Sequence, residues 1–294
     1  MNRNNKSRSK NPKGSGSKSK ESNPKQKEGD KRVSSRDKRK YIEYKIRVKK
    51  GDPLPSFDEE NVRLNKYLSN AGVCSRREAD VLIPTGIITV NDKVVTELGF
   101  KLKPGDVVKY DGESINLETK RYVLLNKPKG FITTMDDPRG RKTVMTLVKK
   151  ACRERIYPVG RLDRDTTGLL LFTNDGDMAK KLTHPSHQAK KIYHVEVHKV
   201  FKSEDLEKLR TGVDLEDGRM RADKAEYVED SNRELGIEIH SGKNRIVRRM
   251  FEALGYQVLK LDRVQFAGLT KKDLPRGMFR HLSEKEIAFL KMSK

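Results

Sequence analysis

A run of four apolar residues, Leu169-Leu170-Leu171-Phe172, is the strongest constraint on what this chain can fold into. Turn-forming and polar residues bound it, with Gly168 before it and Asn174-Asp175-Gly176 shortly after it. Four residues are too few for a helix, and an uninterrupted apolar run is typical of a strand covered on both faces. We therefore expect a buried strand at the centre of a sheet.

Four aspartates surround this run, Asp163 and Asp165 before it and Asp175 and Asp177 after it. Asn174-Asp175-Gly176 is typical of a turn that starts a helix, where Asp175 can cap free backbone N–H groups. Asp177 would then lie in the first helical turn, where the helix dipole favours negative charge. The pattern predicts structural roles for Asp175 and Asp177.

Asp163 has a different setting, because Arg161 and Arg164 flank it. Gly160 just before them permits backbone conformations that other residues resist. A carboxylate between two cations favours its charged form, and an ionised carboxylate in a basic groove is suited to act as a nucleophile. A structural ion-pair network in a loop would use the same residues. From the residues alone both interpretations stay open.

The segment DRDTT (163–167) also matches D-x-D-x-T, the aspartyl-phosphate signature of magnesium-dependent phosphohydrolases. In that class the aspartates follow an apolar strand and lie at its carboxyl end. Here YPVGRL precedes the aspartates and the apolar strand follows them. The phosphohydrolase is kept only as an alternative.

The segment KKIYHVEVHK downstream alternates between apolar and polar residues, which predicts a strand. Tyr193 shares a face with Val195 and Val197, as either a cleft-lining residue or a core tyrosine. The opposite face carries His194, Glu196 and His198. No cysteine or carboxylate cluster completes a metal site there, so we expect an exposed polar face.

A later segment, GKNRIVRRMFEALG (242–255), predicts a helix that ends at Gly255. Its apolar face would consist of Val247, Met250, Phe251 and Leu254. Several cations gather at its N-terminal end, where the helix dipole disfavours positive charge: Lys243, Arg245, Arg248 and Arg249. We therefore expect an anion beside them, either a phosphate or a protein carboxylate, with Asp163 as the candidate.

Charge and apolar residues are distributed unevenly along the 294 residues, whose net charge is +23. Residues 1–50 hold 19 Lys/Arg and 5 Asp/Glu, and residues 1–40 contain Met1 and Val33 as their only apolar residues. Such a composition predicts a disordered basic tail, which we place at 1–60. Its function would be sequence-independent RNA binding or improved solubility. The chain has two cysteines and no apolar run long enough for a membrane span, which fits a reducing, soluble compartment.

The segment 61–112 predicts a small module of two helices and a short sheet. VRLNKYLSNAG has helical spacing of apolar residues, Ser75 and Glu78 form a capping-box pattern, and IITVNDKVV indicates a hairpin. The stretches RLNKYLSNAGVCSRREAD and GIITVNDKVV resemble the S4 RNA-binding domain, with Pro84 as a departure that shortens the second helix. The resemblance implies RNA as the polyanion, and the candidate contacts are Arg63, Lys66, Arg76 and Arg77.

After a linker at 113–120, RYVLLNKPKGFITT predicts two strands around a Pro-Lys-Gly turn, and the rest of a second domain extends to about residue 290. GRLDRDTTGLLLFTNDGD, KKIYHVEV and GKNRIVRRM together resemble ribosomal RNA pseudouridine synthases of the RsuA/RluB type. The resemblance implies an α+β fold with a mixed, mainly antiparallel sheet and flanking helices. Ile246 stands where many relatives have glutamine.

The same resemblance implies roles for individual residues. Asp163 would be the nucleophile, Tyr193 would pack against the target base, and Arg248 would pair with Asp163. Arg161 would help to flip the base, and Arg164, Lys243, Arg245 and Arg249 would contact RNA.

The implied function is isomerisation of a specific uridine in ribosomal RNA, more specifically that of the large subunit. We expect no metal and no cofactor, ribosomal RNA as the partner, no membrane association, and a cytoplasmic monomer. A ribosome assembly factor that binds ribosomal RNA without catalysis remains the alternative of a different class.

Overall fold

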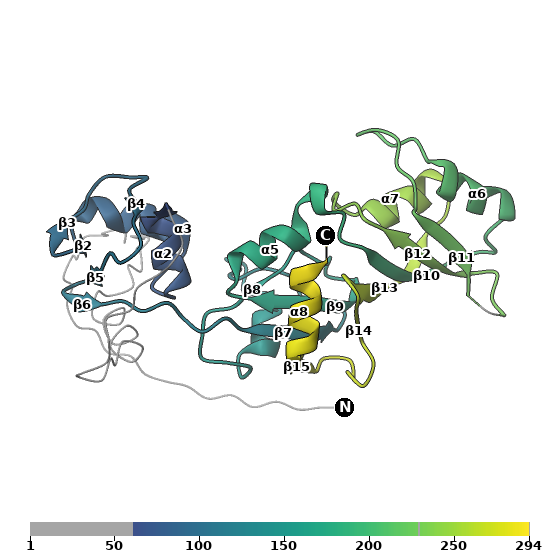
Figure 1. The fold of residues 1–294 in the computed structure, drawn as a ribbon. Helices are drawn as coiled ribbons and strands as arrows, with labels where there is room; N and C mark the ends of the chain where they lie inside the picture. The colour runs from purple at the N-terminus through teal and green to yellow at the C-terminus, as the bar shows by residue number, and fades with distance from the viewer. Residues whose placement is uncertain (1–60, 229, 294) are drawn as a thin grey trace, which may run out of the picture. The chain divides into compact units, whose positions relative to one another are not determined.

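The computed structural model describes residues 61–228 and 230–293 of the chain (Figure 1). The basic tail predicted at 1–60 lies outside the described residues. The described part has the predicted α+β character, with short helices and mainly antiparallel sheets. It consists of two regions.

The first region contains the two predicted helices, α2 (Leu64–Asn70) and α3 (Arg76–Leu82), and a short 3-10 helix η1 (Ile83–Thr85) that includes Pro84. The capping box is confirmed, because the Ser75 hydroxyl accepts from Glu78 N and the Glu78 carboxylate accepts from Ser75 N. The predicted hairpin also forms, with Asn91 and Asp92 at φ 50° and 64° in its turn. The strands are β1 (Val62–Arg63), β2 (Ile88–Val90), β3 (Lys93–Val94), β4 (Lys101–Leu102), β5 (Val108–Tyr110) and β6 (Glu113–Ser114). They form a four-stranded sheet in the order β3-β2-β5-β6 and a separate β1-β4 pair.

The second region is built on a nine-stranded sheet whose main path runs β11-β12-β10-β13-β9-β7-β15. All strand pairings in this sheet are antiparallel except that of β9 with β13. Its strands are β7 (Tyr122–Lys127), β8 (Tyr157–Pro158), β9 (Thr167–Thr173), β10 (Lys191–Val197), β11 (Lys224–Tyr227), β12 (Glu234–Ile239), β13 (Val258–Phe266), β14 (Leu269–Thr270) and β15 (Phe279–His281).

The apolar run forms β9, between β7 and β13, and all four of its residues are fully buried. The central buried strand is therefore confirmed. Because side chains alternate along a strand, Leu169 and Leu171 contribute to one core and Leu170 and Phe172 to the other.

Helices cover both faces of the sheet. The core that contains Leu169 is closed by α5 (Gly176–Thr183) and α8 (Glu284–Met292). The core that contains Leu170 is closed by α4 (Met145–Val148), α6 (Ser203–Thr211) and α7 (Ile246–Ala253). Figure 1 shows α5 and α8 beside β7 to β9, and α6 and α7 beside β10 to β12. A 3-10 helix η2 (Pro185–His187) follows α5.

Two local predictions have different outcomes. Asp175 caps α5 as expected, since its carboxylate accepts from Met178 N at 3.2 Å and from the Tyr122 hydroxyl at 2.6 Å. The strand expected after the Pro-Lys-Gly turn does not form. Only an isolated bridge joins Ile132 to Thr143, and the Thr133 hydroxyl bonds to Leu162 in the loop that carries Asp163.

Candidate active site

The loop that leads into β9 places Asp163 at the edge of a cleft, and a buried lysine holds this loop. Lys127, at the end of β7, has a fully buried side chain. Its ammonium donates to the carbonyl oxygens of Asp163 at 3.0 Å, Arg164 at 3.2 Å and Thr166 at 2.7 Å. Burial lowers the pKa of Lys127 to about 8, although the nearby Asp163 and Asp165 oppose this shift. These hydrogen bonds to three carbonyl groups of the loop hold its backbone in place.

A close approach of β9 to β13 fixes the other end of the loop. Gly168 has φ +105° and pairs with Arg263, and a Cβ atom there would lie 2.3 Å from the Arg263 carbonyl oxygen. Only glycine fits this position without a shift of the backbone. Thr167 adds a side-chain bond, since its hydroxyl donates to Asp262 Oδ1 at 2.8 Å. The strand that follows Asp163 is therefore locked to its neighbour.

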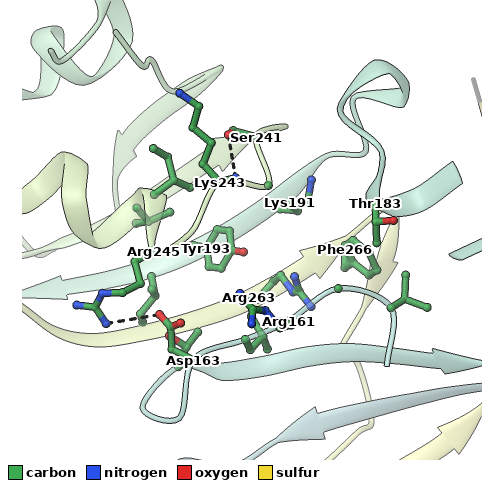
Figure 2. Close-up of a pocket in the computed structure, with 18 of the residues that line it drawn as sticks. Arg161, Asp163, Thr183, Lys191, Tyr193, Ser241, Lys243, Arg245, Arg263 and Phe266 are labelled. Carbon is green, nitrogen blue, oxygen red and sulfur yellow. Dashed lines mark hydrogen bonds and ion pairs between the residues drawn. The ribbon is translucent and has the colours of Figure 1, made fainter. Parts of the chain in front are cut away.

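The ion-pair partner of Asp163 differs from the expected one. The Asp163 side chain is 34% exposed, and its Oδ2 lies 3.7 Å from Nη1 of Arg245. Arg245 is the N-cap of α7 and has a left-handed backbone at φ 48°. This conformation turns the residue that precedes the helix toward the Asp163 loop (Figure 2).

Arg248, predicted to pair with Asp163, instead faces the protein interior. It is 9% exposed, and its Nη1 donates to the Val258 carbonyl oxygen at 3.0 Å. Burial lowers the pKa of Arg248, Arg245 lowers it further, and Asp163 and Asp165 act in the opposite direction. The two carboxylates thus act on Arg248 through space, while the direct pair is Asp163–Arg245. A helix turn separates the two arginines, and sequence spacing could not show which one the loop would meet.

Tyr193 and Asp163 line the same cleft, which has a volume of about 150 Å³ (Figure 2). Tyr193 lies on β10 and is 8% exposed, and its neighbours on the same face, Val195 and Val197, are buried as predicted. Its phenol ring forms part of the cleft wall, where a flat base could pack against it. The cleft is lined by segments 159–163, 182–183, 241–243 and 245–247 and by Thr166, Lys191, Tyr193, Leu261, Arg263 and Phe266.

Cations predicted to bind RNA occupy different places around the cleft. Arg161, Lys243 and Arg245 are exposed and line it, whereas Arg164 is exposed but does not. Asp217 pairs with Lys243 at 3.4 Å and also with Arg249. Of the four cations predicted to contact RNA in the first region, Arg63, Arg76 and Arg77 are exposed and Lys66 is half-buried.

Charged side chains of the neighbouring strands contact the polar face of β10. His194 contacts Glu234 at 2.7 Å, and Glu196 pairs with Lys260 at 2.6 Å. In residues 61–228 and 230–293 no group of three or more His, Cys, Asp or Glu side chains could hold a metal ion. The same residues contain no helix that is both long and apolar enough to cross a membrane.

Sequence reasoning missed three residues of the site, Lys127, Lys191 and Arg263. Lys127 is the last residue of the apolar strand β7, and Lys191 is the first residue of the alternating strand β10. Both lie on a buried face, a position unusual for lysine. That signal could have identified them, because a lysine at a buried register position needs a specific partner. Arg263 gave no such signal, since LKLDRVQF has no clear alternation.

Comparisons with known proteins agree with this arrangement. The family model described as RNA pseudouridylate synthase matches residues 121–253, and the S4 domain model matches residues 62–108. The chain is 44% identical to ribosomal large subunit pseudouridine synthase B of Bacillus subtilis (strain 168), over 78% of this chain and 95% of that protein. It is 39% identical to the protein of the same name from Vibrio cholerae, over 78% of this chain and 74% of that one.

A solved structure described as a pseudouridylate synthase superposes with a TM-score of 0.57 and 26% identity. It covers 78% of this chain and 99% of that one. These similarities favour the synthase over the phosphohydrolase and the non-catalytic assembly factor. The chain belongs to the RNA pseudouridylate synthases of the RsuA/RluB type, with an S4 domain before the synthase domain.

Proposed function

We propose that this protein isomerises a specific uridine of large-subunit ribosomal RNA to pseudouridine, with Asp163 as the nucleophile. The observation that carries the nucleophile assignment is the position of Asp163. Its carboxylate is partly exposed at a cleft edge, faces Arg245 at 3.7 Å and shares the cleft with Tyr193. The ribosomal large subunit in the names of the Bacillus and Vibrio relatives supports the choice of RNA.

The reaction breaks the N1–C1′ bond of uridine and joins C5 to C1′. Three routes use a carboxylate at this place. Asp163 could attack C1′, attack C6 of the ring, or remove the 2′ proton so that a glycal forms. Each route requires an ionised carboxylate, and the guanidinium of Arg245 lies 3.7 Å from the Asp163 carboxylate. Each route also requires a uridine turned out of its helix, at a cost of a few kcal/mol.

The other residues of the site have roles in binding. Tyr193 offers the aromatic face against which the flipped base packs. Arg161 lies exposed at the cleft, where its guanidinium can occupy the space that the base leaves. Arg248 supports the anion site from the interior, through its charge rather than a direct contact. Phosphate contacts fall to Arg164, Lys243, Arg245 and Arg249 and, in the S4 domain, to Arg63, Lys66, Arg76 and Arg77.

The domain limits, assembly and location complete the proposal. The S4 domain spans 61–112, a linker spans 113–120, and the synthase domain spans 121–290. The protein acts as a monomer, without metal or cofactor. We propose a cytoplasmic location, in keeping with ribosomal RNA as the substrate.

Replacement of Asp163 by asparagine tests the nucleophile. The amide keeps the shape but cannot attack, so pseudouridine formation should fall by at least about 10⁴-fold, as for loss of other nucleophiles. RNA affinity should stay within a few-fold. The measurement is single-turnover conversion of a ribosomal RNA fragment, with binding followed separately.

The matched control is Asp165→Asn, the same change in an exposed carboxylate two residues along the loop. It should retain activity within a few-fold. Substantial turnover by Asp163→Asn would refute the assignment. Sequencing of pseudouridine positions in ribosomal RNA from cells that lack the gene would identify the uridine, and loss of a site in the small subunit alone would refute the choice of RNA.

A further inference from the structure

Two buried cations lie beside Tyr193 on the wall of the cleft. In the antiparallel pair of β10 and β13, Tyr193 is directly opposite Arg263, so the two side chains point to the same face, about 5 Å apart at Cβ. Lys191 precedes Tyr193 by two residues and shares that face. Arg263 is 3% exposed and Lys191 9% exposed, and both line the cleft (Figure 2). We call Lys191 and Arg263 the buried cation pair.

Protein groups satisfy this pair only in part. Arg263 Nε donates to the Leu169 carbonyl oxygen at 2.7 Å, and its guanidinium lies 4.5 Å from the centre of the Phe266 ring. Its Nη2 is buried without a hydrogen-bond partner among the described residues. Lys191 Nζ donates to the carbonyl oxygens of Ala189 and His240, both at 2.7 Å.

Neither cation has a carboxylate within 4.0 Å in the described part of the chain. Burial lowers the pKa of Lys191 to about 8, and the charge of Arg263 lowers it further. Burying an unpaired charge destabilises a fold, and a buried donor without a partner requires an explanation. A fold that keeps both in the wall of its reaction cleft gains most if negative charge arrives there during the reaction.

We propose that Arg263, assisted by Lys191, contacts the carbonyl oxygens of the flipped uracil and stabilises the negative charge that these oxygens gain in the reaction. This inference rests on the proposed function. A base packed on the Tyr193 ring presents its edge to the residue opposite Tyr193, which is Arg263.

A backbone phosphate fits this place less well than the base. Phosphates stay hydrated at the surface of a bound strand, and exposed cations already stand at the rim, namely Arg161, Lys243 and Arg245. The buried cation pair lies in the wall, which the base reaches once it has left its stack. The rim cations and the buried pair therefore serve different parts of the nucleotide.

The charge on the uracil oxygens is common to all three routes. Attack at C1′ forms an O–C1′ bond and breaks N1–C1′, and the electron pair of that bond passes to the ring and is shared by O2 and O4. Removal of the 2′ proton forms a C1′=C2′ bond and releases the same uracil anion. Attack at C6 moves the C5=C6 pair through C5 onto O4. In the first route C5 then bonds to C1′ as the O–C1′ bond breaks and frees the carboxylate. In the glycal route C5 bonds to C1′ as the carboxylate returns its proton to C2′. In the C6 route the N1–C1′ bond breaks, C5 bonds to C1′ and the O–C6 bond breaks. In every route C5 loses its proton and N1 gains one.

The same contacts would select uridine against cytidine. Cytosine carries an amino group where uracil has O4. The N–H donors of that amino group would face the N–H donors of the buried cation pair, with no acceptor between them. Binding that leaves such groups unpaired is strongly disfavoured.

Replacement of Arg263 by glutamine, and separately by lysine, tests the proposal. A donor directed at developing charge is worth about 10²- to 10³-fold in rate. Arg263→Gln should therefore lower the single-turnover rate at saturating RNA by about 10²-fold or more, with RNA affinity within a few-fold. Arg263→Lys should lose less. Lys260→Gln is the control, because Lys260 lies on the same strand but is 77% exposed and pairs with Glu196. It should leave the rate unchanged.

Substrates with 2-thiouridine or 4-thiouridine at the target position identify the contact. Sulfur accepts hydrogen bonds more weakly than oxygen, so one of the two should slow the wild-type protein more than it slows Arg263→Gln or Arg263→Lys. If the role of Arg263 is purely structural, each thio substrate should slow the wild type and the variants by the same factor. That outcome overturns the inference even if Arg263→Gln folds poorly. If Arg263→Gln converts the RNA at the normal rate and Asp163→Asn does not convert it, the inference about Arg263 is overturned and the proposed function stands. A wild-type protein that forms no pseudouridine would refute the proposed function instead.

Discussion

Lys127 shows how one side chain can position a reactive loop from behind. Its ammonium is fully buried and donates to carbonyl oxygens of residues 163, 164 and 166. Backbone carbonyls are obligatory acceptors, and the Lys127 ammonium satisfies three of them at once. The charge of Lys127 therefore organises the loop, at an energetic cost that burial imposes on the ammonium.

That cost predicts a pH dependence of stability. An unfolded lysine has a pKa of about 10.4, whereas that of Lys127 in the fold is about 8. Between these values the unfolded chain binds more protons, so the free energy of unfolding should rise with pH. The rise due to Lys127 should be about 1 to 3 kcal/mol from pH 7.5 to 10.5.

Urea unfolding of the wild type and of Lys127→Met at both pH values isolates this contribution, because the two proteins differ only at this titratable group. The wild type should gain stability relative to the variant as pH increases. Parallel pH profiles would contradict the prediction. The variant should also lose activity, since its loop carbonyls lack donors.

At the scale of elements, the junction of β9 with β13 connects the sheet to the reactive loop. These strands form the parallel pairing of the large sheet, and Gly168 opposite Arg263 allows their close approach. The same residues link the core to the site, since Arg263 Nε holds the Leu169 carbonyl oxygen. A change in strand packing here would therefore move both Asp163 and Arg263.

Gly168→Ala should lower the free energy of unfolding by about 3 kcal/mol or more. Its Cβ would lie 2.3 Å from a backbone oxygen and its φ of +105° is unfavourable for alanine. The turnover should fall as well, because Asp163 precedes the junction by five residues.

Gly236→Ala provides the control for this substitution. Gly236 lies in β12 and has nothing within 4 Å of an added Cβ atom. The free energy of unfolding of Gly236→Ala should differ from that of the wild type by less than about 1 kcal/mol. Chemical denaturation of both variants gives the comparison, and similar losses in the two would show that the close approach is unimportant.

At the scale of the whole molecule, nearly half of the net charge of +23 lies within residues 1–40, where 15 Lys/Arg and 4 Asp/Glu give a net of +11. Cations bind RNA phosphates through release of counterions, independently of sequence. Base selection instead requires contacts in a shaped site.

Deletion of residues 1–40 should therefore weaken RNA binding and reduce the slope of log K against log salt concentration. The modified uridine should stay the same, and turnover at saturating RNA should remain within a few-fold. Salt titrations of both proteins on one ribosomal RNA fragment measure the slope. A full-length variant with Lys and Arg of 1–40 changed to Gln separates charge from length, and it should behave like the deletion. An unchanged slope would indicate that the segment only improves solubility.

Local patterns in the sequence determined much of this protein. The apolar run predicted β9, Asp175 predicted the start of α5, and the capping box predicted the start of α3. These features depend on neighbours within a few residues, and sequence spacing records such neighbours directly. The loop with Asp163 was predictable for the same reason, because it lies between a flexible glycine and a buried strand.

Only the tertiary structure decided which cations the loop and the cleft would meet. Arg245 rather than Arg248 faces Asp163 because residue 245 has a left-handed backbone just before α7. Lys127 reaches the loop from β7, and Arg263 reaches Tyr193 through the register of β13 against β10. Register and strand order join residues 36 to 94 positions apart. Such contacts follow from packing of the whole sheet, since many long side chains of like charge are compatible with the same local pattern.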